Sequence, residues 1–523
     1  MIIPACEEIL SLADEYDIIP ICREVYADVV TPITLLRRIA ERSRRFYLLE
    51  SIEGGEKWGR YSFLGYDPVM RVTCRCGRVD IESSAAEIPS RQVETDRPMD
   101  VLREILKKYR APKLKGQPPF TGGFVGYFAY AMIEYAEPTL HISRGGANDF
   151  DLMLFDKVIA YDHLKQKIQI VVNMKTGRVP EAEGTSKTGS ASEAEGSSKT
   201  AGAPEKKGLE YLMKEYGRAC EAIQDMASLI NETAPLKRLS SPERPSFTCS
   251  VSKEEFCRTV EKTKEYILDG DIFQAVISRQ FTSPYEGSLL NAYRVLRTTN
   301  PSPYMVYMNI DQDEIISTSP ETLVRLKDGR LTTFPVAGSR PRGTTEEEDR
   351  RLEEELLADE KELSEHNMLV DLGRNDIGRI AEFGSVEVTE YKMVHKYSKI
   401  MHICSQVEGD IKQGLDGCAA IEALLPAGTL SGAPKIRACE IIEELEGVPR
   451  GIYGGALGYL DFTGNLDTCI AIRMAVKQAG RVTVQSGGGI VADSVPETEY
   501  EESANKAKAV IQAIEQAGEV NDR

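Results

Sequence analysis

The sequence predicts a mixed fold of α-helices and β-strands with more than one subdomain. Its 523 residues exceed what one simple core usually organises. Short segments in the first third alternate apolar and polar residues, which is typical of strands. The second half contains amphipathic segments that begin with helix-capping residues. A composition of 41% hydrophobic and 28% charged residues is that of an ordinary globular protein.

The N-terminal region, residues 1–175, is expected to consist mainly of strands. The segments that alternate like strands are RFYLLESIE (45–53), RYSFLGYD (60–67), VMRVTCRCGRVDI (69–81) and KVIAYDHLKQKIQIVVNM (157–174). GGFVGYFAYAMIEY (122–135) is expected to form a strand that leads into a helix.

Residues 176–207 divide this region from the rest of the chain. They are rich in Gly, Ser, Thr, Ala, Glu and Lys and contain no aromatic residue. Such a segment cannot bury enough apolar area to offset its chain entropy. We therefore expect a flexible insertion that carries no chemistry.

The C-terminal region, residues 208–523, is expected to alternate helices and strands. The predicted helices are Leu209 to Asn231, a helix opened by the capping box Ser252–Glu255 and running to about Leu268, one opened by Thr345–Glu348 and extending towards Met368, and a last one that begins near Pro496 and ends at Gly518. FQAVISRQF (273–281) alternates like a strand.

Charge and composition exclude several kinds of partner. The net charge of −18 and the absence of a Lys/Arg stripe argue against nucleic acid. No apolar stretch reaches the roughly 18 residues of a membrane span. The first residues lack the pattern of a secretory leader. The eleven scattered cysteines are expected to be reduced, so the predicted location is the cytoplasm.

Paired glutamates are the first chemical signal. Glu362 and Glu365 share a helix face because they are three residues apart, and Glu499 and Glu502 repeat this spacing. Taken by itself, each pair is equally explained by an acidic helix face that is exposed to solvent. If the helices converge, however, like charges require a cation, and oxygen ligands suit Mg²⁺. The sequence therefore allows a magnesium site.

Arg473 and a run of three glycines suggest a second site that binds an anion. TCIAIRMAV (468–476) is predicted to be one buried strand, so its arginine needs an anion, either a protein carboxylate or a ligand. Gly487, Gly488 and Gly489 can bring backbone N–H groups close to an anion, or they form a plain tight turn. His402 lies in an apolar run and is either a core residue or a general acid–base.

Several motifs, in this order and spacing over about 246–518, resemble the chorismate-utilising enzymes. They are DIFQAVISRQF, NPSPYMVYM, STSPETLVR, FPVAGSRPRG, DEKELSEHNMLVDLGRNDIGR, AGTLSGAPK, GIYGGALGYL, DTCIAIR and QSGGGIVADSVPETEYEE. Within that family the chain is most similar to the large synthase subunits of the anthranilate-forming enzymes. The resemblance implies large antiparallel sheets packed face to face as a sandwich, with helices outside.

The resemblance also implies a lyase reaction, in which chorismate and ammonia give anthranilate and pyruvate through 2-amino-2-deoxyisochorismate. It implies that Glu365 and Glu502 hold Mg²⁺, with Glu362 and Glu499 in supporting positions. The implied chorismate contacts are Gly338, Ser339, Thr429, Tyr453, Arg473, Gly487, Gly488 and Gly489. Glu321 would be the general acid for the departing 4-hydroxyl, and His402 would be the base for the later proton removal.

Two positions separate the subfamilies within this resemblance. Gln274 stands where relatives that add water carry a lysine base, which favours ammonia as the nucleophile. Ala337 stands where relatives that make aminodeoxychorismate often carry a lysine nucleophile, so ammonia would add directly. A subunit of an aminodeoxychorismate synthase and an inactive tryptophan-sensing relative remain the alternatives.

The resemblance finally implies regulation and a partner. Feedback inhibition by L-tryptophan would use residues 1–175 together with part of the C-terminal region: Glu50, Ser51, Lys57, Asn300, Pro303, Tyr304 and Met305. The chain contains no recognisable glutamine amidotransferase region, so ammonia from glutamine would require a separate small subunit.

Overall fold

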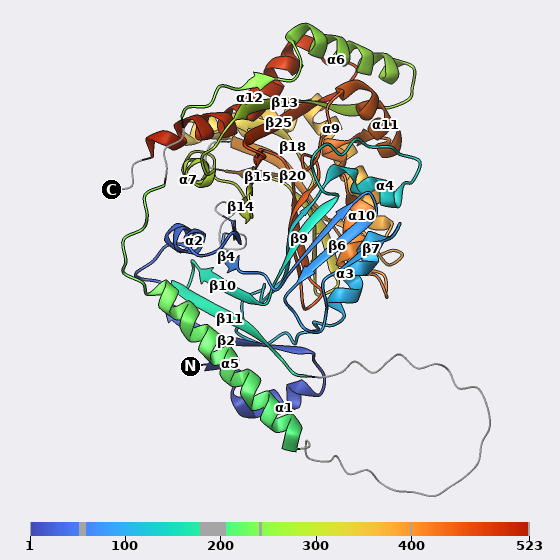
Figure 1. Ribbon diagram of the computed structural model, residues 1–523. Coiled ribbons are helices and arrows are strands. Elements are labelled where there is room, and N and C mark those ends of the chain that lie inside the picture. Colours follow the sequence, from blue (N-terminus) through green and yellow to red (C-terminus); the bar gives the residue numbers. More distant parts are fainter. Residues whose placement is uncertain (1, 52–58, 178–205, 240–242, 398–399, 521–523) are drawn as a thin grey trace, which may run out of the picture.

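The computed structural model describes residues 2–51, 59–177, 206–239, 243–397 and 400–520. In this part of the chain, all strands from β1 to β25 belong to two large antiparallel sheets (Figure 1). The predicted insertion 176–207 falls mostly outside the described residues. Thr176 directly follows a strand, and residues 206 and 207 begin a helix.

The first sheet has thirteen strands, in the order β1 (Ile2–Ile3), β2 (Ile18–Tyr26), β11 (Lys167–Lys175), β10 (Lys157–Asp162), β4 (Tyr61–Tyr66), β3 (Arg45–Glu50), β14 (Tyr304–Ile310), β15 (Asp313–Ser319), β24 (Met474–Gln478), β25 (Arg481–Ile490), β13 (Gln274–Pro284) and β12 (Thr248–Cys249), with β21 (Gly432–Ala433) paired to β13. The second sheet has twelve strands, in the order β18 (Val336–Pro341), β20 (Ile400–Asp410), β17 (Arg330–Thr333), β16 (Thr322–Lys327), β23 (Leu466–Ile470), β22 (Ala456–Asp461), β8 (Gly123–Phe128), β9 (Phe150–Phe155), β5 (Met70–Arg75), β6 (Arg78–Ser83) and β7 (Arg91–Glu94), with β19 (Glu387–Lys396) paired to β20.

The helices are α1 (Cys6–Ala13), α2 (Pro32–Ala40), α3 (Pro98–Leu106), α4 (Ile133–Ala136), α5 (Lys206–Ile230), α6 (Lys253–Leu268), α7 (Leu290–Thr299), α8 (Glu346–Ala358), α9 (Glu360–Gly378), α10 (Gly417–Leu424), α11 (Lys435–Glu446) and α12 (Pro496–Gln516), and the short 3-10 helices are η2 (Tyr130–Met132), η3 (Gly428–Leu430) and η4 (Ala517–Glu519). None of the helices in the described part of the chain is long and apolar enough to span a membrane. All eleven cysteines are free.

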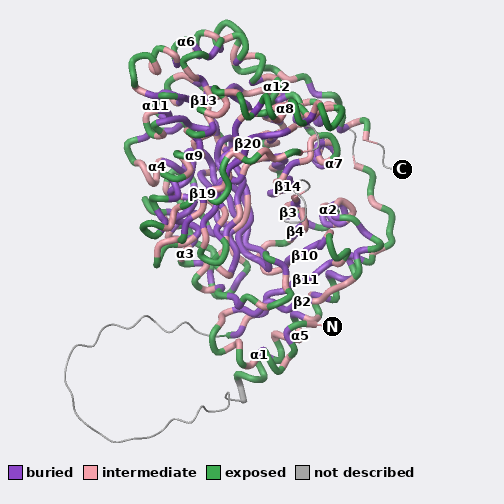
Figure 2. The backbone as a smooth tube through the Cα atoms, turned by 180° about the vertical axis from the view of Figure 1, so that it is seen from behind, coloured by how far each residue is buried: buried purple, intermediate pink, exposed green. Residues whose placement is uncertain are grey.

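The two sheets pack face to face with helices outside, which confirms the predicted fold class. One core cluster joins apolar side chains of both sheets, among them Tyr47, Val306, Val125 and Leu457. Two larger clusters cover the outer faces, where helices pack. Figure 2 shows this division, because the central strands are largely buried and helices such as α1, α6 and α8 present exposed residues.

Strands from both ends of the sequence share each sheet. In the first sheet β3 pairs with β14, and Leu49 lies opposite Val306. In the second sheet β8 pairs with β22, and Val125 lies opposite Tyr459. Residues 1–175 and 208–523 are therefore built into the same two sheets.

The helix that was predicted to run from Thr345 towards Met368 is broken at Asp359, which corrects that prediction. Asp359 has an extended backbone, ends α8 and begins α9. Its carboxylate accepts hydrogen bonds from the backbone N–H groups of Lys361 and Glu362 at 3.1 and 3.2 Å. This new N-terminal cap allows α9 to change direction and places Glu362 and Glu365 in its first turns.

Candidate active site and inter-sheet pocket

Two short segments cross between the sheets side by side. Pro320 and Glu321 link β15 of the first sheet to β16 of the second, and residues 471–473 link β23 back to β24. The backbone N–H of Ile470 donates to the carbonyl of Glu321 at 3.0 Å, and that of Thr318 donates to the carbonyl of Arg473 at 3.1 Å. Glu321 and Arg473, 152 positions apart in the numbering, therefore meet at the crossing point.

The structure corrects the prediction of one continuous strand through Arg473. The strand ends at Ile470, because the chain leaves the second sheet there, and a new strand of the first sheet begins at Met474. Arg473 has φ +45°, a left-handed conformation that costs a non-glycine residue about 1–2 kcal/mol. Strain of this kind concentrates at functional sites.

The guanidinium of Arg473 forms no hydrogen bond or ion pair with any residue that the structure describes. Burial lowers the pKa of Arg473, and the carboxylate of Glu321 acts in the opposite direction. A largely buried cation without a contacting protein carboxylate is available to an anionic ligand.

The carboxyl group of Glu321 has a pKa close to neutral pH. Burial raises its pKa to about 7, while a hydrogen bond from Thr429 and the charge of Arg473 lower it. The hydroxyl of Thr429, in η3, donates to Oε1 of Glu321 at 3.0 Å. Both residues line a small cavity of about 40 Å³. The carboxyl group can therefore donate or accept a proton at physiological pH.

His402 is held by a bulge between β18 and β20. The pairing shifts between Ala337 and Ser339, so that Ser339 lies opposite His402. Nδ1 of His402 is 3.0 Å from the carbonyl oxygen of Gly338, whose φ is +66°. Because a carbonyl only accepts, Nδ1 carries the proton and Nε2 carries the lone pair of the neutral ring. Burial lowers the pKa of His402, the Gly338 carbonyl raises it and Arg473 lowers it further.

The glycine run lies inside a strand, not in the tight turn that the sequence also allowed. Gly487, Gly488 and Gly489 belong to β25, opposite Ser278, Ile277 and Val276 of β13. A Cβ at Gly487 would lie 2.3 Å from the carbonyl oxygen of Ile277, and one at Gly488 would lie 3.0 Å from Oε2 of Glu499. Gly487 therefore has no room for a side chain, whereas at Gly488 the nearest atom belongs to a flexible side chain.

Gln274 and Tyr453 border the same strand. A Cβ at Gly489 would lie 2.1 Å from Nε2 of Gln274, whose buried Oε1 has no hydrogen-bond partner among the described residues. The side chain of Tyr453 is buried and hydrogen-bonds to the backbone of Gly487, and burial raises its pKa. The predicted chorismate contacts therefore lie on β18, β25 and η3, on the crossing segment 471–473 and in the turn before β22.

The four predicted metal-site glutamates converge from α9 and α12. Burial raises the pKa values of Glu362, Glu365 and Glu499, and the negative charge of Glu502 raises each of them further. Oε2 of Glu362 lies beside Gly338, just as Oε2 of Glu499 lies beside Gly488. The carboxylates of Glu362 and Glu499 thus lie beside two glycines that were predicted to contact chorismate (Figure 1, where α9, α12, β18 and β25 gather).

Cations compensate this negative cluster. Lys506 pairs with Glu502 at 2.8 Å and donates to the carbonyl of Gly487 at 3.3 Å. In the described part of the chain, no three carboxylates or other ligands are close enough together to hold a metal by themselves. Sequence reasoning missed Lys506, although its position four residues after Glu502 on the same helix was the available signal.

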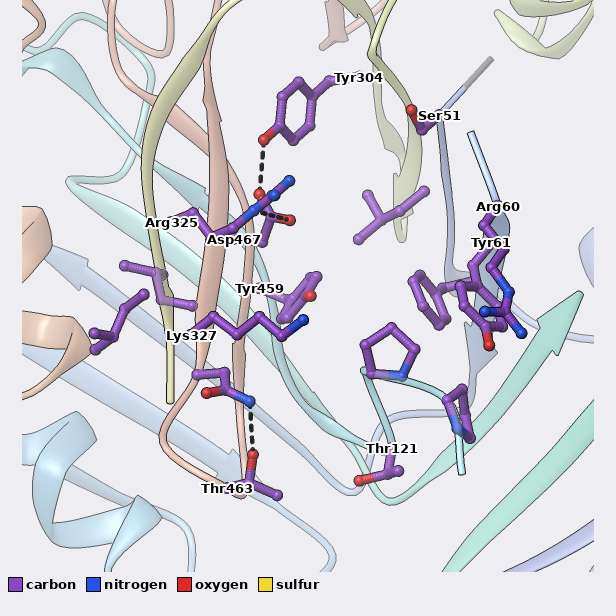
Figure 3. Close-up of a pocket in the computed structure, with 18 of the residues that line it drawn as sticks. Ser51, Arg60, Tyr61, Thr121, Tyr304, Arg325, Lys327, Tyr459, Thr463 and Asp467 are labelled. Atoms are coloured by element: carbon purple, nitrogen blue, oxygen red, sulfur yellow. Dashed lines mark hydrogen bonds and ion pairs between the residues drawn. The ribbon is translucent and has the colours of Figure 1, made fainter. Parts of the chain in front are cut away.

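The predicted regulatory residues line a cavity of about 570 Å³ between the sheets, which we call the inter-sheet pocket (Figure 3). Glu50, Ser51, Pro303, Tyr304 and Met305 all border it. Lys57 lies outside the described residues. Asn300 does not line the pocket, and its amide instead donates to Thr318 at 3.3 Å.

Glu50 is held rigidly at the end of β3. Its buried carboxylate accepts hydrogen bonds from Ser62 (2.9 Å), Tyr293 (2.8 Å) and Arg297 (2.8 and 3.1 Å). The neighbouring Ser51 has a buried hydroxyl with no partner among the residues that the structure describes. Glu50 thus anchors the wall, and Ser51 offers a free hydrogen-bonding group to a ligand.

A two-sheet sandwich that carries a buried arginine, a poised carboxyl group and clustered glutamates defines a class of enzymes that bind small organic anions. The chorismate binding enzyme family matches residues 47–512. The chain therefore belongs to this family, which confirms the resemblance seen in the sequence.

Within the family, the chain is similar over almost its whole length to proteins named anthranilate synthase component 1. The protein of Acetivibrio thermocellus is 44% identical over 99% of this chain and 100% of its own length, and that of Aquifex aeolicus is 43% identical over 98% of each. The crystal structure of anthranilate synthase component I from Streptococcus pneumoniae has a TM-score of 0.72 at 32% identity, covering 94% of this chain and 99% of that one. The isochorismate synthase MenF of Escherichia coli shares the fold, with a TM-score of 0.65 at 18% identity.

Proposed function

We propose that this chain is the synthase subunit of an anthranilate synthase, a lyase that converts chorismate and ammonia to anthranilate, pyruvate and water. The relatives named above support the activity. One structural observation carries the proposal, namely that Glu321 and Arg473 meet where the chain crosses between the sheets. A protonatable acid beside an unpaired cation suits a substrate that bears two carboxylates and loses a hydroxyl group.

The proposed substrate position lies between β25 and β18. Arg473 would bind the enolpyruvyl carboxylate, and the glycines 487–489 would leave room for the ring and present backbone N–H groups. Gly338, Ser339, Thr429 and Tyr453 would complete the contacts.

Two groups of the chain would move protons. Glu321, whose pKa is about 7, would protonate the departing 4-hydroxyl while ammonia adds to the ring and gives 2-amino-2-deoxyisochorismate. Nε2 of His402 would later remove the ring proton as pyruvate leaves, because Nδ1 is engaged by the Gly338 carbonyl. Gln274 carries no charge and would leave ammonia, rather than water, as the nucleophile. Ala337 offers no amine, so no covalent intermediate with the chain would form.

The glutamate cluster fits Mg²⁺, with Glu365 and Glu502 as the proposed ligands and Glu362 and Glu499 behind them. Its donors are all carboxylate oxygens, and burial together with the negative charge of Glu502 raises the pKa values of Glu362, Glu365 and Glu499. Two protein carboxylates suffice, because Mg²⁺ commonly keeps waters and shares an anionic substrate. Bound there, the ion would supply electrophilic stabilisation of the ring carboxylate. Lys506 would release Glu502 as the ion binds.

Tryptophan is the proposed feedback inhibitor, and a glutamine amidotransferase is the proposed partner. Ser51, Pro303, Tyr304 and Met305 of the inter-sheet pocket would contact the amino acid. The number in the relatives' name, component 1, supports the existence of a second component. This chain would bind tryptophan, the end product, and the second component would supply ammonia.

The test is turnover of the purified chain with chorismate, Mg²⁺ and ammonium salt. We expect anthranilate fluorescence and pyruvate to appear in equal amounts. A product without this fluorescence, formed without pyruvate, would instead assign the chain to aminodeoxychorismate synthesis. No consumption of chorismate would assign it to an inactive tryptophan-sensing relative.

A further inference from the structure

The inter-sheet pocket extends well beyond the residues assigned to tryptophan. Ser51 and Tyr304 lie at one end of the cavity, whereas Thr121 and Thr463 lie at the other, with Tyr459 between them (Figure 3). We call the end that contains Thr121 and Thr463 the lower end. A volume of about 570 Å³ is within the usual range for sites that hold drug-sized ligands.

The lower end contains a buried hydroxyl that lacks a partner. Thr121 is 6% exposed, and its Oγ1 makes no hydrogen bond with any described residue. The residue is fixed in place, because its carbonyl accepts from Nδ2 of Asn173 at 2.7 Å. Figure 3 shows the hydroxyl directed into the space that separates it from Thr463. A buried hydroxyl without a hydrogen-bond partner costs about 1–3 kcal/mol of free energy. A ligand that forms this hydrogen bond is therefore favoured.

The lower end also has one positive charge in excess. Most charged side chains that line the pocket are already paired, as Arg325 is with Asp467 at 3.2 Å and Lys113 is with Asp328. The ammonium of Lys327, by contrast, forms no ion pair or hydrogen bond within the described part of the chain, and Figure 3 shows it directed into the cavity beside Tyr459. A cation next to an aromatic ring suits a ligand that carries an anionic group on a flat body.

One wall of the inter-sheet pocket is pre-formed. Pro112, Pro118 and Pro119 line it, and each proline has a fixed φ angle. The amide of Gln117 donates to the carbonyl of Pro20 at 2.7 Å and ties this segment to β2. A rigid wall lowers the entropy cost of binding.

We propose that the lower end of the inter-sheet pocket is a second ligand subsite, which binds a small aromatic carboxylate or phosphate through Lys327 and Thr121. The anion contacts the ammonium, the Thr121 hydroxyl completes its hydrogen bonds, and the ring packs against the proline wall and Tyr459. The subsite itself does not depend on the proposed function, whereas its place beside tryptophan does.

The experiment titrates two probes, 4-bromobenzoate and 4-bromophenyl phosphate, into the full chain by calorimetry, with and without saturating L-tryptophan. The neutral 4-bromobenzyl alcohol serves as a control ligand. We expect one probe to bind with a Kd of about 0.1–1 mM, as ligand efficiency allows for so small a molecule. The probe that binds more tightly shows whether the subsite prefers a carboxylate or a phosphate. Bromine anomalous scattering from soaked crystals should place it beside Lys327.

Variants connect the affinity to the named side chains. Lys327→Met should weaken the better probe at least about tenfold, because a charge-assisted hydrogen bond is lost, and Thr121→Val should weaken it about threefold to tenfold. Lys107→Met, which removes an exposed lysine at the C-terminal end of α3 and outside the pocket, is the matched control and should bind as the parent does.

Several results would overturn the proposal: no binding of either probe, equal binding of the neutral alcohol, full competition by tryptophan, or unchanged affinity in Lys327→Met. Failure of tryptophan itself to bind would overturn the proposed inhibition instead, and the titration without tryptophan would still decide the subsite.

Discussion

The hydroxyl of Thr429 donates a hydrogen bond of 3.0 Å to one carboxylate oxygen of Glu321. Burial raises the pKa of this carboxyl group to about 7, and the hydrogen bond from Thr429 opposes the rise because it stabilises the charged form. The acid that is proposed to protonate the leaving group is thereby held near neutral pH. A second effect follows for the orientation of Glu321, since only one of its oxygens remains free to face the substrate.

Removal of this hydrogen bond should shift the pH dependence of turnover upwards. Glu321 acts as an acid while it is protonated, so kcat should fall as the pH rises through its pKa. Thr429→Val removes a stabilising contact of the carboxylate worth about 1 kcal/mol, which raises the pKa by somewhat less than one unit. The alkaline limb of the kcat profile should therefore move by about half to one pH unit towards higher pH. Thr429→Ser keeps the hydroxyl and should leave the limb in place, and a shift to lower pH in the valine variant would contradict the assigned role.

Substitution of Glu502 should separate activity from stability. Glu502 lies on an exposed part of α12 and pairs only with Lys506 among the described residues, so Glu502→Gln should change the free energy of unfolding by less than about 1 kcal/mol. It should lower turnover at saturating Mg²⁺ at least about a hundredfold if the carboxylate is a ligand, since two protein ligands become one. The neighbouring Glu501→Gln is the matched control, because Glu501 has only a 3.8 Å contact with Lys253. Near-normal turnover of the Glu502→Gln variant would remove Glu502 from the proposed metal site.

The glycines of β25 should respond differently to a methyl group. At Gly487 the added Cβ would lie 2.3 Å from a backbone carbonyl, which cannot move aside without disturbing the sheet. Gly487→Ala should therefore destabilise the protein by about 1–3 kcal/mol in chemical denaturation. At Gly488 the nearest atom belongs to the flexible side chain of Glu499, at 3.0 Å. Gly488→Ala should fold nearly as well as the parent and lose most of its kcat/KM for chorismate. Equal loss of stability at both positions would show that the second glycine is structural.

Arg473 should be dispensable for folding and necessary for catalysis. Its left-handed backbone and its largely buried charge both cost free energy, and glycine adopts that backbone without strain. Arg473→Gly should leave the free energy of unfolding unchanged or raise it by about 1 kcal/mol, whereas kcat/KM should fall at least about a hundredfold. Arg473→Lys keeps the charge but loses the bidentate geometry, so it should retain intermediate activity. Easy unfolding of the Arg473→Gly variant would assign the arginine to the fold instead of the substrate.

Ser51 should control inhibition without affecting synthesis. Its hydroxyl is buried at one end of the inter-sheet pocket, and a phenyl ring there would fill the space that the proposed inhibitor needs. Ser51→Phe should raise the tryptophan concentration for half inhibition at least about tenfold and change kcat for anthranilate formation less than about twofold. Ser51→Ala, which keeps the space and removes only the hydroxyl, should have a smaller effect. Unchanged inhibition in the phenylalanine variant would place the inhibitor elsewhere.

Several elements could be predicted because their signals are local. The capping box of Ser252 and Glu255 forms with both of its hydrogen bonds, at 3.2 and 2.9 Å. Pro496 begins the last helix as expected. The break at Asp359 was missed, since an aspartate between two acidic amphipathic stretches looks like one more exposed residue of a continuous helix. Its capping role depends on where α9 packs, and local periodicity does not contain that information.

The sequence by itself determined the residue types and the spacings: glutamates three apart, a glycine run, an arginine in an apolar segment and motifs that resemble one enzyme family. Only the tertiary structure decided that the arginine segment is not a strand but a crossing between two sheets, next to the crossing that carries Glu321. It also decided that Glu502 acts electrostatically on glutamates of α9, 137 or more positions away, and that Lys506 compensates them. The physical reason is that helix and strand signals arise within a few residues, whereas sheet order, desolvation and the meeting of like charges depend on contacts between distant segments.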